Sequence, residues 1–263
     1  MIQKLRKLIP GIIIDRAIFY WQRFCHARSN YFFRRTNPQI TFPNAYTLYE
    51  SYQLDYKKYW EDGEQTAKEI VESIDPYLTN KNTILDWGCG PSRITRHLQK
   101  FAASASIYAC DPNIETILWN QKNIPNIRFE VQEKYPPLPF QDNYFDLLIG
   151  FSVLTHIPSQ EQRKWLHEIH RILKPNGVAW LTTHGHYFIK RLSKKEKREI
   201  ESSGVYNTRY HQTGHRMMST YHLPEKWKRV LEEKFEILEY RDGERYPNKA
   251  GKQDLWILRK RKV

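Results

Sequence analysis

Two acids and two glycines lie at the ends of short apolar runs, at a spacing that suits ligand binding. Residues 83–87 (TILDW) carry Asp86 near their end and lead into Gly88 and Gly90. A Gly-x-Gly turn between a strand and a helix lets a ligand approach the backbone closely and offers it free N–H groups. Asp111 follows the next apolar run, 25 residues after Asp86, where a carboxylate can accept bonds from both hydroxyls of a ribose.

The same turn departs from the fingerprint of dinucleotide-binding proteins. Arg93 occupies the position where that fingerprint requires a third glycine for close packing of the helix, which disfavours binding of NAD. Each acid by itself is also typical of a turn or a cap at a strand end. Because the acids occur together with the two glycines, the pattern favours a ligand site over isolated turns.

The elements that position these residues alternate between strand and helix. Apolar runs typical of strands alternate with helical patterns at 93–101, 114–121 and about 160–173, and a turn at 174–177 follows the last helix. A helix near 224–233 and two more strands close the chain. This order predicts an α/β fold with a doubly wound, mostly parallel, seven-stranded sheet covered on both faces. The expected strands are 83–87, 106–110, 126–131, 144–153, 177–183, 235–240 and 254–260.

The length of 263 residues suits one main domain with an appendage. Residues 1–62 are rich in arginine and aromatic residues, and we expect them to form an N-terminal helical extension. We expect residues 63–263 to form the main domain. An amphipathic helix at 62–74 leads to its first strand. Residues 186–222 show weak periodicity and many Lys, Arg, His and Tyr, which predicts an inserted lid after the fifth strand.

The net charge of +13 belongs to the two ends of the chain. Residues 1–35 hold eight Lys and Arg against one acid, and residues 185–263 hold twenty against eleven. The middle holds fourteen against seventeen. Basic ends of this kind suit anionic lipid, a phosphate-bearing substrate, nucleic acid or plain solvent exposure.

The cysteines and the N-terminal apolar run bear on location. Cys25, Cys89 and Cys110 form no C-x-x-C pair, so we expect neither a disulfide framework nor a metal site, which favours the cytoplasm. The apolar run at 8–14 is too short to span a bilayer and is followed by no cleavage site. Residues 1–14 are either an ordinary buried or capping helix or a peripheral contact with the inner face of a membrane.

Four segments carry a resemblance to a known family. They are LDWGCGPSR (85–93), YACDPN (108–113), PPLPFQDNYFDLLIGFSVLTHI (136–157) and RILKPNG (171–177). Over about residues 70–185 the chain resembles the class I S-adenosylmethionine-dependent methyltransferases, which implies a Rossmann-like fold and S-adenosylmethionine as the cofactor. The resemblance implies that Asp86, Gly88 and Gly90 line its methionine end and that Asp111 binds its ribose. The remaining cofactor-binding residues that it implies are Pro112, Gln132, Glu133 and Phe151.

The resemblance places the adenine beside Gln132 or Glu133, although this segment lacks the usual Asp-Ala pair. The reaction that it implies is methyl transfer, and a hydroxyl acceptor would need a general base. His156 and His184 follow the fourth and fifth strands, at the rim where such sheets bind ligands. A structural role in the loop is the alternative for each histidine. We expect a group of lid residues to shape the acceptor site: Tyr206, Arg209, Tyr210, His211, His215 and Arg216.

Residues 152–185 and the closing GKQDLWILRK are similar to methyltransferases found beside glycosyltransferases of bacterial surface-polysaccharide pathways. This similarity implies a small-molecule, sugar or glycolipid acceptor and a role in polysaccharide biosynthesis. An RNA methyltransferase is an alternative supported by the basic charge, but no separate RNA-binding module and no Asn-Pro-Pro-Tyr-like tetrad is present. A protein that binds S-adenosylmethionine without catalysis is the other alternative. The sequence does not predict an oligomeric state.

Overall fold

The computed structural model describes residues 11–208, 218–245 and 251–261, and the chain divides into two compact units at residues 63 and 64. The first unit contains α2 (Gly11–Thr36), α3 (Ala45–Ser51) and the beginning of α4 (Tyr56–Ile74). The second unit contains the rest of α4 and all strands of the described residues. This division lies one residue beyond the boundary expected from the sequence.

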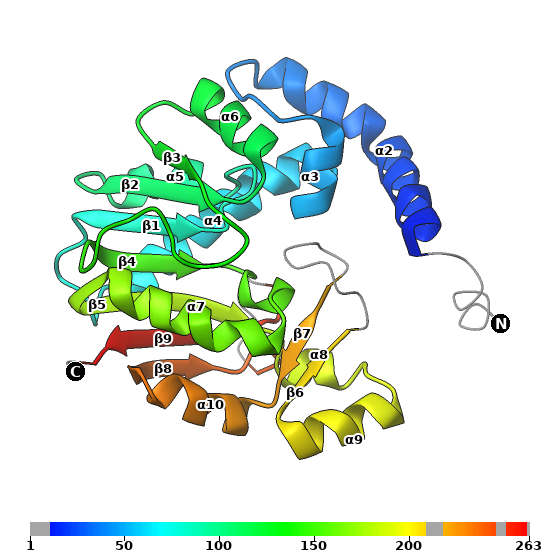
Figure 1. The fold of residues 1–263 in the computed structure, drawn as a ribbon. Coiled ribbons are helices and arrows are strands. Elements are labelled where there is room, and N and C mark those ends of the chain that lie inside the picture. Colours follow the sequence, from blue (N-terminus) through cyan, green and yellow to red (C-terminus); the bar gives the residue numbers. More distant parts are fainter. Residues whose placement is uncertain (1–10, 209–217, 246–250, 262–263) are drawn as a thin grey trace. The chain divides into compact units, whose positions relative to one another are not determined.

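A seven-stranded sheet forms the centre of the second unit, in the order β3-β2-β1-β4-β5-β9-β8. The strands from β1 to β5 are parallel, and β9 runs antiparallel to both of its neighbours. The predicted doubly wound, mostly parallel sheet is therefore confirmed (Figure 1). Its strands are β1 (Thr83–Trp87), β2 (Ser106–Asp111), β3 (Arg128–Val131), β4 (Phe145–Gly150), β5 (Leu173–Thr183), β8 (Phe235–Arg241) and β9 (Asp254–Lys260).

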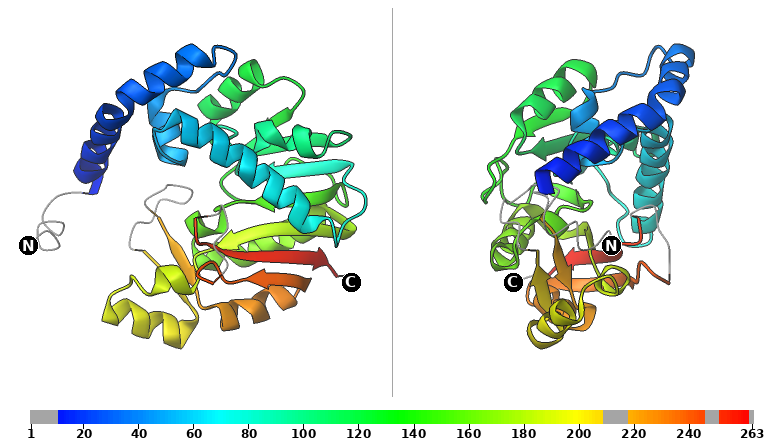
Figure 2. Two further views of the ribbon diagram at one scale, coloured as in Figure 1. Left: turned by 180° about the vertical axis from the view of Figure 1, so that it is seen from behind. Right: turned by 90° about the vertical axis from the view of Figure 1, so that its right-hand side faces the viewer.

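Helices cover both faces of this sheet (Figure 2). The second half of α4 packs with α5 (Thr95–Phe101) on one face, and α6 (Ile114–Asn123) contacts β2 and β3. On the other face lie α7 (Ser159–Ile172) and α10 (Pro224–Glu232). The apolar stripe predicted for α7 is buried, including Trp165 and Ile169. Burying side chains of this size contributes about 1.5–3 kcal/mol each, which holds the helices on the sheet.

The junction between α7 and β5 differs from the predicted one. The turn at 174–177 was expected to separate the helix from the strand, but β5 already begins at Leu173, which pairs with Phe145. Lys174 holds this segment beside β4, because its Nζ lies 3.0 and 2.9 Å from the carboxylate oxygens of Asp146. Asn176 adopts a φ of 65°, so the chain turns inside the strand, with a register shift in the pairing of β4 and β5.

The insertion after β5 consists of short elements beyond the carboxyl edge of the sheet (Figures 1 and 2). They are α8 (His186–Ile189), α9 (Lys194–Ser203), β6 (Val205–Asn207) and β7 (Thr220–His222), and β6 pairs antiparallel with β7. A capping box between Ser193 and Glu196 begins α9. Of the lid residues predicted to shape the acceptor site, only Tyr206 belongs to the described residues. It is buried, and its hydroxyl donates to Glu196 Oε1 at 2.8 Å.

The first unit has a core of its own. Aromatic and aliphatic side chains from α2, α3 and the start of α4 pack together, and the Tyr49 hydroxyl donates to Asp15 Oδ1 at 2.8 Å. The core residues are Phe19, Ile40, Phe42, Leu48, Tyr49, Leu54 and Tyr59. None of the helices in the described parts of the chain is long and apolar enough to cross a membrane.

Candidate functional site

The loop after β1 is held against the end of β2. The backbone N–H groups of Gly88 and Cys89 both donate to the Cys110 carbonyl, at 2.8 and 3.0 Å. Gly88 and Gly90 have φ values of 71° and 49°, in the region where only glycine is free of strain. A Cβ on Gly88 would also lie 2.6 Å from Val153 Cγ2. Gly88 therefore lets the loop pack closely against Val153, and both glycines allow a backbone conformation that a larger residue would strain.

Asp111 faces this loop from the end of β2. Its Oδ2 accepts a hydrogen bond from the Gly90 N–H at 2.9 Å, and its Oδ1 accepts one from the Asn113 N–H at 2.9 Å. Burial raises the pKa of Asp111, and these two bonds act in the opposite direction. Each carboxylate oxygen has two lone pairs, so the fixed carboxylate can accept further bonds from a diol. The predicted ribose-binding role fits this arrangement.

Asp86 lies deeper in the same edge of the sheet, with 3% of its surface exposed. The Thr95 hydroxyl donates to Asp86 Oδ2 at 2.5 Å. Burial raises the pKa of Asp86 to about 7, against the opposing effects of Thr95 and of the positive charge of Arg93. A carboxylate in this state gains from a cation placed beside it, because the cation offsets the loss of hydration.

Arg93, which replaces the third glycine of the dinucleotide fingerprint, is itself buried, with 7% of its surface exposed. Its guanidinium carbon lies 5.1 Å from the centre of the Phe151 ring. Phe151 in turn stacks parallel to Trp180, with ring centres 6.1 Å apart and planes 9° apart. Phe151, an expected cofactor residue, therefore lies directly after β4, between the Arg93 guanidinium and the buried Trp180 indole.

Gln132 and Glu133, the two candidates beside the adenine, differ in burial. The backbone N–H of Gln132 donates to the backbone carbonyl of Asp111 at 3.2 Å. This bond fixes Gln132 directly beside Asp111, the residue expected to bind the ribose. Gln132 is 7% exposed, whereas Glu133 is exposed to solvent. Within the described residues, the buried Gln132 Oε1 has no hydrogen-bond partner. A buried acceptor without a partner is costly unless a ligand supplies a donor, such as the amino group of adenine.

Sequence reasoning missed the residue that supports the loop from α6. Asn120 is fully buried, and its Nδ2 donates to the Gly90 carbonyl at 2.8 Å. Its position among the apolar residues of the predicted 114–121 helix was the available signal, since a buried amide requires a partner.

The two residues before α6 are less buried than Asn120. Pro112, an expected cofactor residue, is half-buried, and Asn113 is exposed. Asn113 caps α6, because its side chain accepts a hydrogen bond from the Thr116 N–H at 3.0 Å.

The two candidate bases lie close enough for the charge of His156 to affect His184. His156 ends the 3₁₀ turn η1 (Leu154–His156), and its Nδ1 is 2.8 Å from the Met218 carbonyl. A carbonyl can only accept, so Nδ1 carries the proton and Nε2 holds the lone pair of the neutral ring. This contact joins the rim of β4 to the insertion.

His184 has a more apolar setting at the end of β5. Its ring packs against Phe188, with centres 4.2 Å apart, and against Tyr221 at 5.3 Å. The side chain is half-buried, but its Nδ1 is enclosed and has no partner among the described residues. Burial lowers the pKa of His184 to about 3, and His156 adds to this effect. His184 is therefore neutral near pH 7 and a weak proton acceptor.

A third histidine, His222, was not singled out from the sequence. It is buried on β7, and its Nε2 lies 2.7 Å from Gln162 Oε1. Burial lowers its pKa to about 3. Its ring contacts Trp227 of α10 with centres 4.3 Å apart, so His222 packs the insertion against both α7 and α10. Among the described residues, no group of three or more His, Cys, Asp and Glu is arranged to hold a metal ion.

Comparison with known proteins agrees with this geometry. Residues 84–177 match the methyltransferase domain family. The mouse protein "Arginine-hydroxylase NDUFAF5, mitochondrial" is 30% identical over 132 residues, which cover 48% of this chain and 34% of that protein. The first curated relatives share this partial coverage, because the chain spans about a third to a half of their length.

Solved structures show the same fold. A SAM-dependent methyltransferase of Methanosarcina mazei has a TM-score of 0.54 at 24% identity, covering 72% of this chain and 96% of that one. The 1,6-didemethyltoxoflavin-N1-methyltransferase of Burkholderia thailandensis, solved with S-adenosylhomocysteine, has a TM-score of 0.55 at 17% identity, covering 85% and 94%. Residues 84–177 thus match a methyltransferase domain, and the seven-stranded sheet of the second unit has the fold of these solved methyltransferases.

Proposed function

We propose that the protein transfers a methyl group from S-adenosylmethionine to a hydroxyl of a small molecule, sugar or glycolipid. The observation that carries the proposal is the convergence of Asp86, Asp111 and Gln132 at the carboxyl ends of the neighbouring strands β1, β2 and β3. At this edge, beside the glycine loop, the Asp86 carboxylate suits a cation and the Asp111 carboxylate suits a diol. The Gln132 carbonyl oxygen, which has no partner among the described residues, suits an amino group.

These residues fit each part of the cofactor. Asp86 and the loop from Gly88 to Gly90 would hold the methionine end, Asp111 the ribose and Gln132 the adenine, with Phe151 as an apolar wall. The bound cofactor supplies a methyl group on a positively charged sulfur, which is electrophilic without further activation. The work left to the chain is to align the acceptor, exclude water and receive a proton.

The proton acceptor that we propose is His156. Its Nδ1 donates to the Met218 carbonyl, which fixes the ring and directs the basic Nε2 away from that contact. His184 is the weaker candidate for this role, because its protonated form is disfavoured by burial and by His156. We infer that His184 shapes the apolar rim beside His156. The lid residues at 209–217 lie outside the described residues, and their contact with the acceptor remains a proposal.

The acceptor class rests on the resemblance of the sequence and on the basic charge of the insertion. A sugar or glycolipid hydroxyl suits a site that has a histidine base, and with such an acceptor the proposed role is in polysaccharide biosynthesis in the cytoplasm. Methylation of RNA is not favoured, because residues 150–153 read Gly-Phe-Ser-Val where an Asn-Pro-Pro-Tyr-like tetrad would stand. Binding of the cofactor without catalysis is the remaining alternative.

Contact with a membrane surface is a further part of the proposal, and we assign it to residues 1–14. Residues 1–10 lie outside the described residues, but Ile13 is 54% exposed at the start of α2. The same helix continues with exposed aromatic side chains and arginines, a composition typical of helices that lie in a lipid interface. Flotation with anionic vesicles that is lost on deletion of residues 1–14 would support this contact, and absence of flotation would contradict it.

The experiment that tests methyl transfer uses cofactor labelled in the methyl group. The full chain is incubated with mono- and oligosaccharides, with glycolipids and with RNA, and the label in each acceptor is counted. Transfer to a carbohydrate hydroxyl that His156→Gln reduces is the expected result. Transfer to RNA alone would contradict the proposed acceptor, and tight cofactor binding without transfer to any acceptor would support the non-catalytic alternative.

A further inference from the structure

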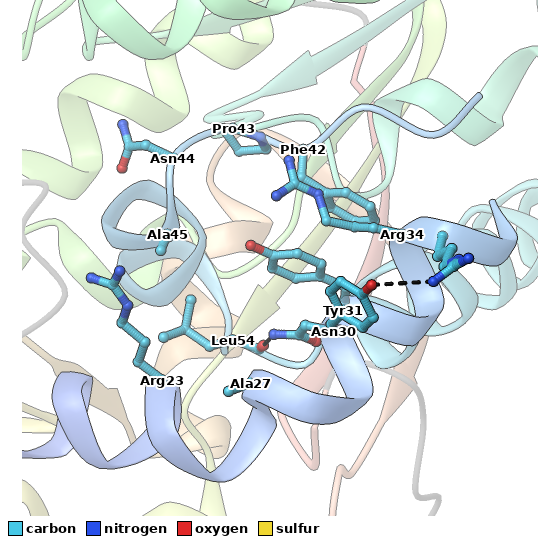
Figure 3. A pocket seen from close by; sticks show the side chains of 12 residues that line it. Arg23, Ala27, Asn30, Tyr31, Arg34, Phe42, Pro43, Asn44, Ala45 and Leu54 are labelled. Atoms are coloured by element: carbon cyan, nitrogen blue, oxygen red, sulfur yellow. Dashed lines mark hydrogen bonds between the residues drawn. The ribbon is translucent and has the colours of Figure 1, made fainter. Parts of the chain in front are cut away.

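The first unit contains a cavity of about 900 Å³ that the proposed methyl transfer does not use. One wall is α2, and the other walls are the segment 42–45 and residues 54 and 56 (Figure 3). All of the lining residues belong to the first unit. The volume lies within the range of small-molecule sites, which is about 300–1,000 Å³.

The walls of this cavity carry positive charge without compensation. Arg23, Arg34 and Arg35 line it, and none of its lining residues is an acid. None of the three guanidinium groups forms an ion pair within the described residues. Figure 3 shows Arg23 and Arg34 on opposite sides of the opening. Arg34 follows Arg23 by eleven positions on one side of α2, which corresponds to about 16 Å along the helix axis and suits an elongated ligand.

The frame of the cavity is fixed by hydrogen bonds that join α2 to the residues before α4. Asn30 Nδ2 donates to the Leu54 carbonyl at 2.5 Å, and Asn30 Oδ1 accepts from the Tyr56 N–H at 2.9 Å. Gln22 Oε1 accepts from the Leu54 N–H at 3.1 Å. These contacts set the distance between the walls before any ligand binds, which lowers the entropic cost of binding.

The aromatic residues hold two of the arginines in place. The Arg34 guanidinium carbon lies 5.6 Å from the centre of the Tyr56 ring, which stacks on Phe42 with centres 4.4 Å apart and planes 14° apart. On the other side, Arg35 Nη1 donates to the Tyr31 hydroxyl at 3.3 Å. The guanidinium groups are thus partly oriented and retain N–H donors, while Tyr31, which is 58% exposed, offers a ring face at the same opening.

We propose that this cavity binds a phosphate ester that carries a ring, such as a nucleotide or a sugar phosphate. Planar guanidinium groups match the oxygens of phosphate, and aromatic faces stack on a base or a sugar ring. The same chemistry occurs in a soluble nucleotide and in a lipid whose headgroup is a sugar phosphate. The residues that line the cavity belong to the first unit and those of the cofactor edge to the second, so the proposal does not depend on methyl transfer.

Calorimetric titration of the full chain tests the proposal with uridine diphosphate as the probe, and with uridine and inorganic phosphate as its separate parts. We expect uridine diphosphate to bind more tightly than either part. Arg34→Gln and Arg23→Gln are expected to weaken binding by about tenfold each. Arg28→Gln is the matched control, because Arg28 lies on the same helix outside the cavity, with its guanidinium 5.9 Å from the Phe32 ring. The affinity of Arg28→Gln for uridine diphosphate is expected to stay within about twofold of that of the wild type.

Flotation with phosphatidylcholine vesicles containing phosphatidylinositol tests the lipid source in the same variants. Binding to these vesicles that Arg34→Gln removes and Arg28→Gln retains would identify the lipid headgroup as the source of the ester. Binding of the soluble nucleotide with no such flotation would identify the soluble source. Equal losses in Arg28→Gln and Arg34→Gln would show diffuse attraction by charge and overturn the proposal. Failure of the folded wild type to bind either probe would also overturn it.

Discussion

The hydroxyl of Thr95 donates a hydrogen bond to Asp86 Oδ2 at 2.5 Å, in a place where Asp86 is almost wholly removed from water. Burial still raises the pKa of Asp86 to about 7. Near neutral pH the protein therefore contains a mixture of protonated and ionised Asp86. A cofactor with a positive methionine end favours the ionised form, so binding and deprotonation are linked.

This linkage predicts that affinity for S-adenosylmethionine falls on acidification. Above pH 8 the carboxylate is already ionised and affinity is constant, whereas below about pH 7 each unit of pH costs up to about tenfold in affinity. Calorimetry between pH 5.5 and 8.5 measures the slope. Asp86→Asn is expected to bind more weakly at high pH and to lose the slope. An equal slope in this variant would assign the proton to another group.

The same shift predicts how the stability of the ligand-free protein depends on pH. Because the folded-state pKa of Asp86 lies above the unfolded value of 3.8, its contribution to stability is complete below pH 4 and is lost as the pH rises through 7. Thermal unfolding of the wild type and Asp86→Asn at pH 5 and 8 measures this contribution. The free energy of unfolding of the wild type should be higher at pH 5 than at pH 8, and in Asp86→Asn this difference should be smaller by about 1–3 kcal/mol. An unchanged difference would contradict the burial of this carboxyl.

Gly88→Ala is expected to destabilise the protein by about 2–4 kcal/mol, because the new Cβ combines a left-handed conformation with overlap of Val153. Gly251→Ala is the matched control. Its φ of 67° imposes the same backbone strain, but its Cβ would meet no atom within 4 Å, so a loss of about 1–2 kcal/mol is expected. Denaturant unfolding compares the two variants. Equal losses would show that Val153 does not close the space beside the loop.

Gln132→Leu removes the buried carboxamide beside Asp111 and is expected to weaken binding of the cofactor by about tenfold. Glu133→Gln changes the neighbouring exposed residue and should leave affinity within about twofold. Gln132→Leu should not lower the stability of the ligand-free protein. The substitution removes a buried acceptor that has no hydrogen-bond partner among the described residues. A greater loss of affinity in Glu133→Gln would move the adenine to Glu133.

Once an acceptor is found, the two histidines can be separated by their rates. His156→Gln is expected to lower kcat by about 100-fold and to remove the acidic limb of the pH profile, as loss of a general base does. His184→Gln should lower kcat by less than about tenfold, because burial disfavours the protonated form that a general base reaches when it accepts a proton. Measurement of kcat against pH in both variants decides between them. The reverse order would return the base to His184.

The order of elements was predictable because strand and helix leave different periodicities in a sequence, and the sheet follows from the alternation of the two. Asp86, Gly88, Gly90 and Asp111 were predictable for the same reason, since they stand at strand ends. The beginning of β5 was not predictable, because the contact of Lys174 with Asp146 is formed between segments distant in the sequence.

The supporting contacts of the site also depend on three-dimensional packing. Asn120 is one polar residue on a helix, and only the fold shows that its amide reaches the Gly90 carbonyl. Gln132 and Glu133 are equivalent as a sequence pattern, and burial alone separates them. The cavity of the first unit likewise depends on Asn30 joining α2 to residues 54 and 56. No local pattern in the sequence contains that relationship.

The most direct measurement is a calorimetric titration of S-adenosylmethionine into the wild type and Asp111→Ala. The account predicts micromolar binding to the wild type and a loss of about 1–3 kcal/mol in the variant, because Asp111 is the proposed ribose ligand and accepts the hydrogen bond of the Gly90 N–H. Asp142→Ala, which alters an exposed carboxylate paired with Arg171, is the control and should bind as the wild type does. A folded wild type that does not bind S-adenosylmethionine would contradict the proposed function at its first step.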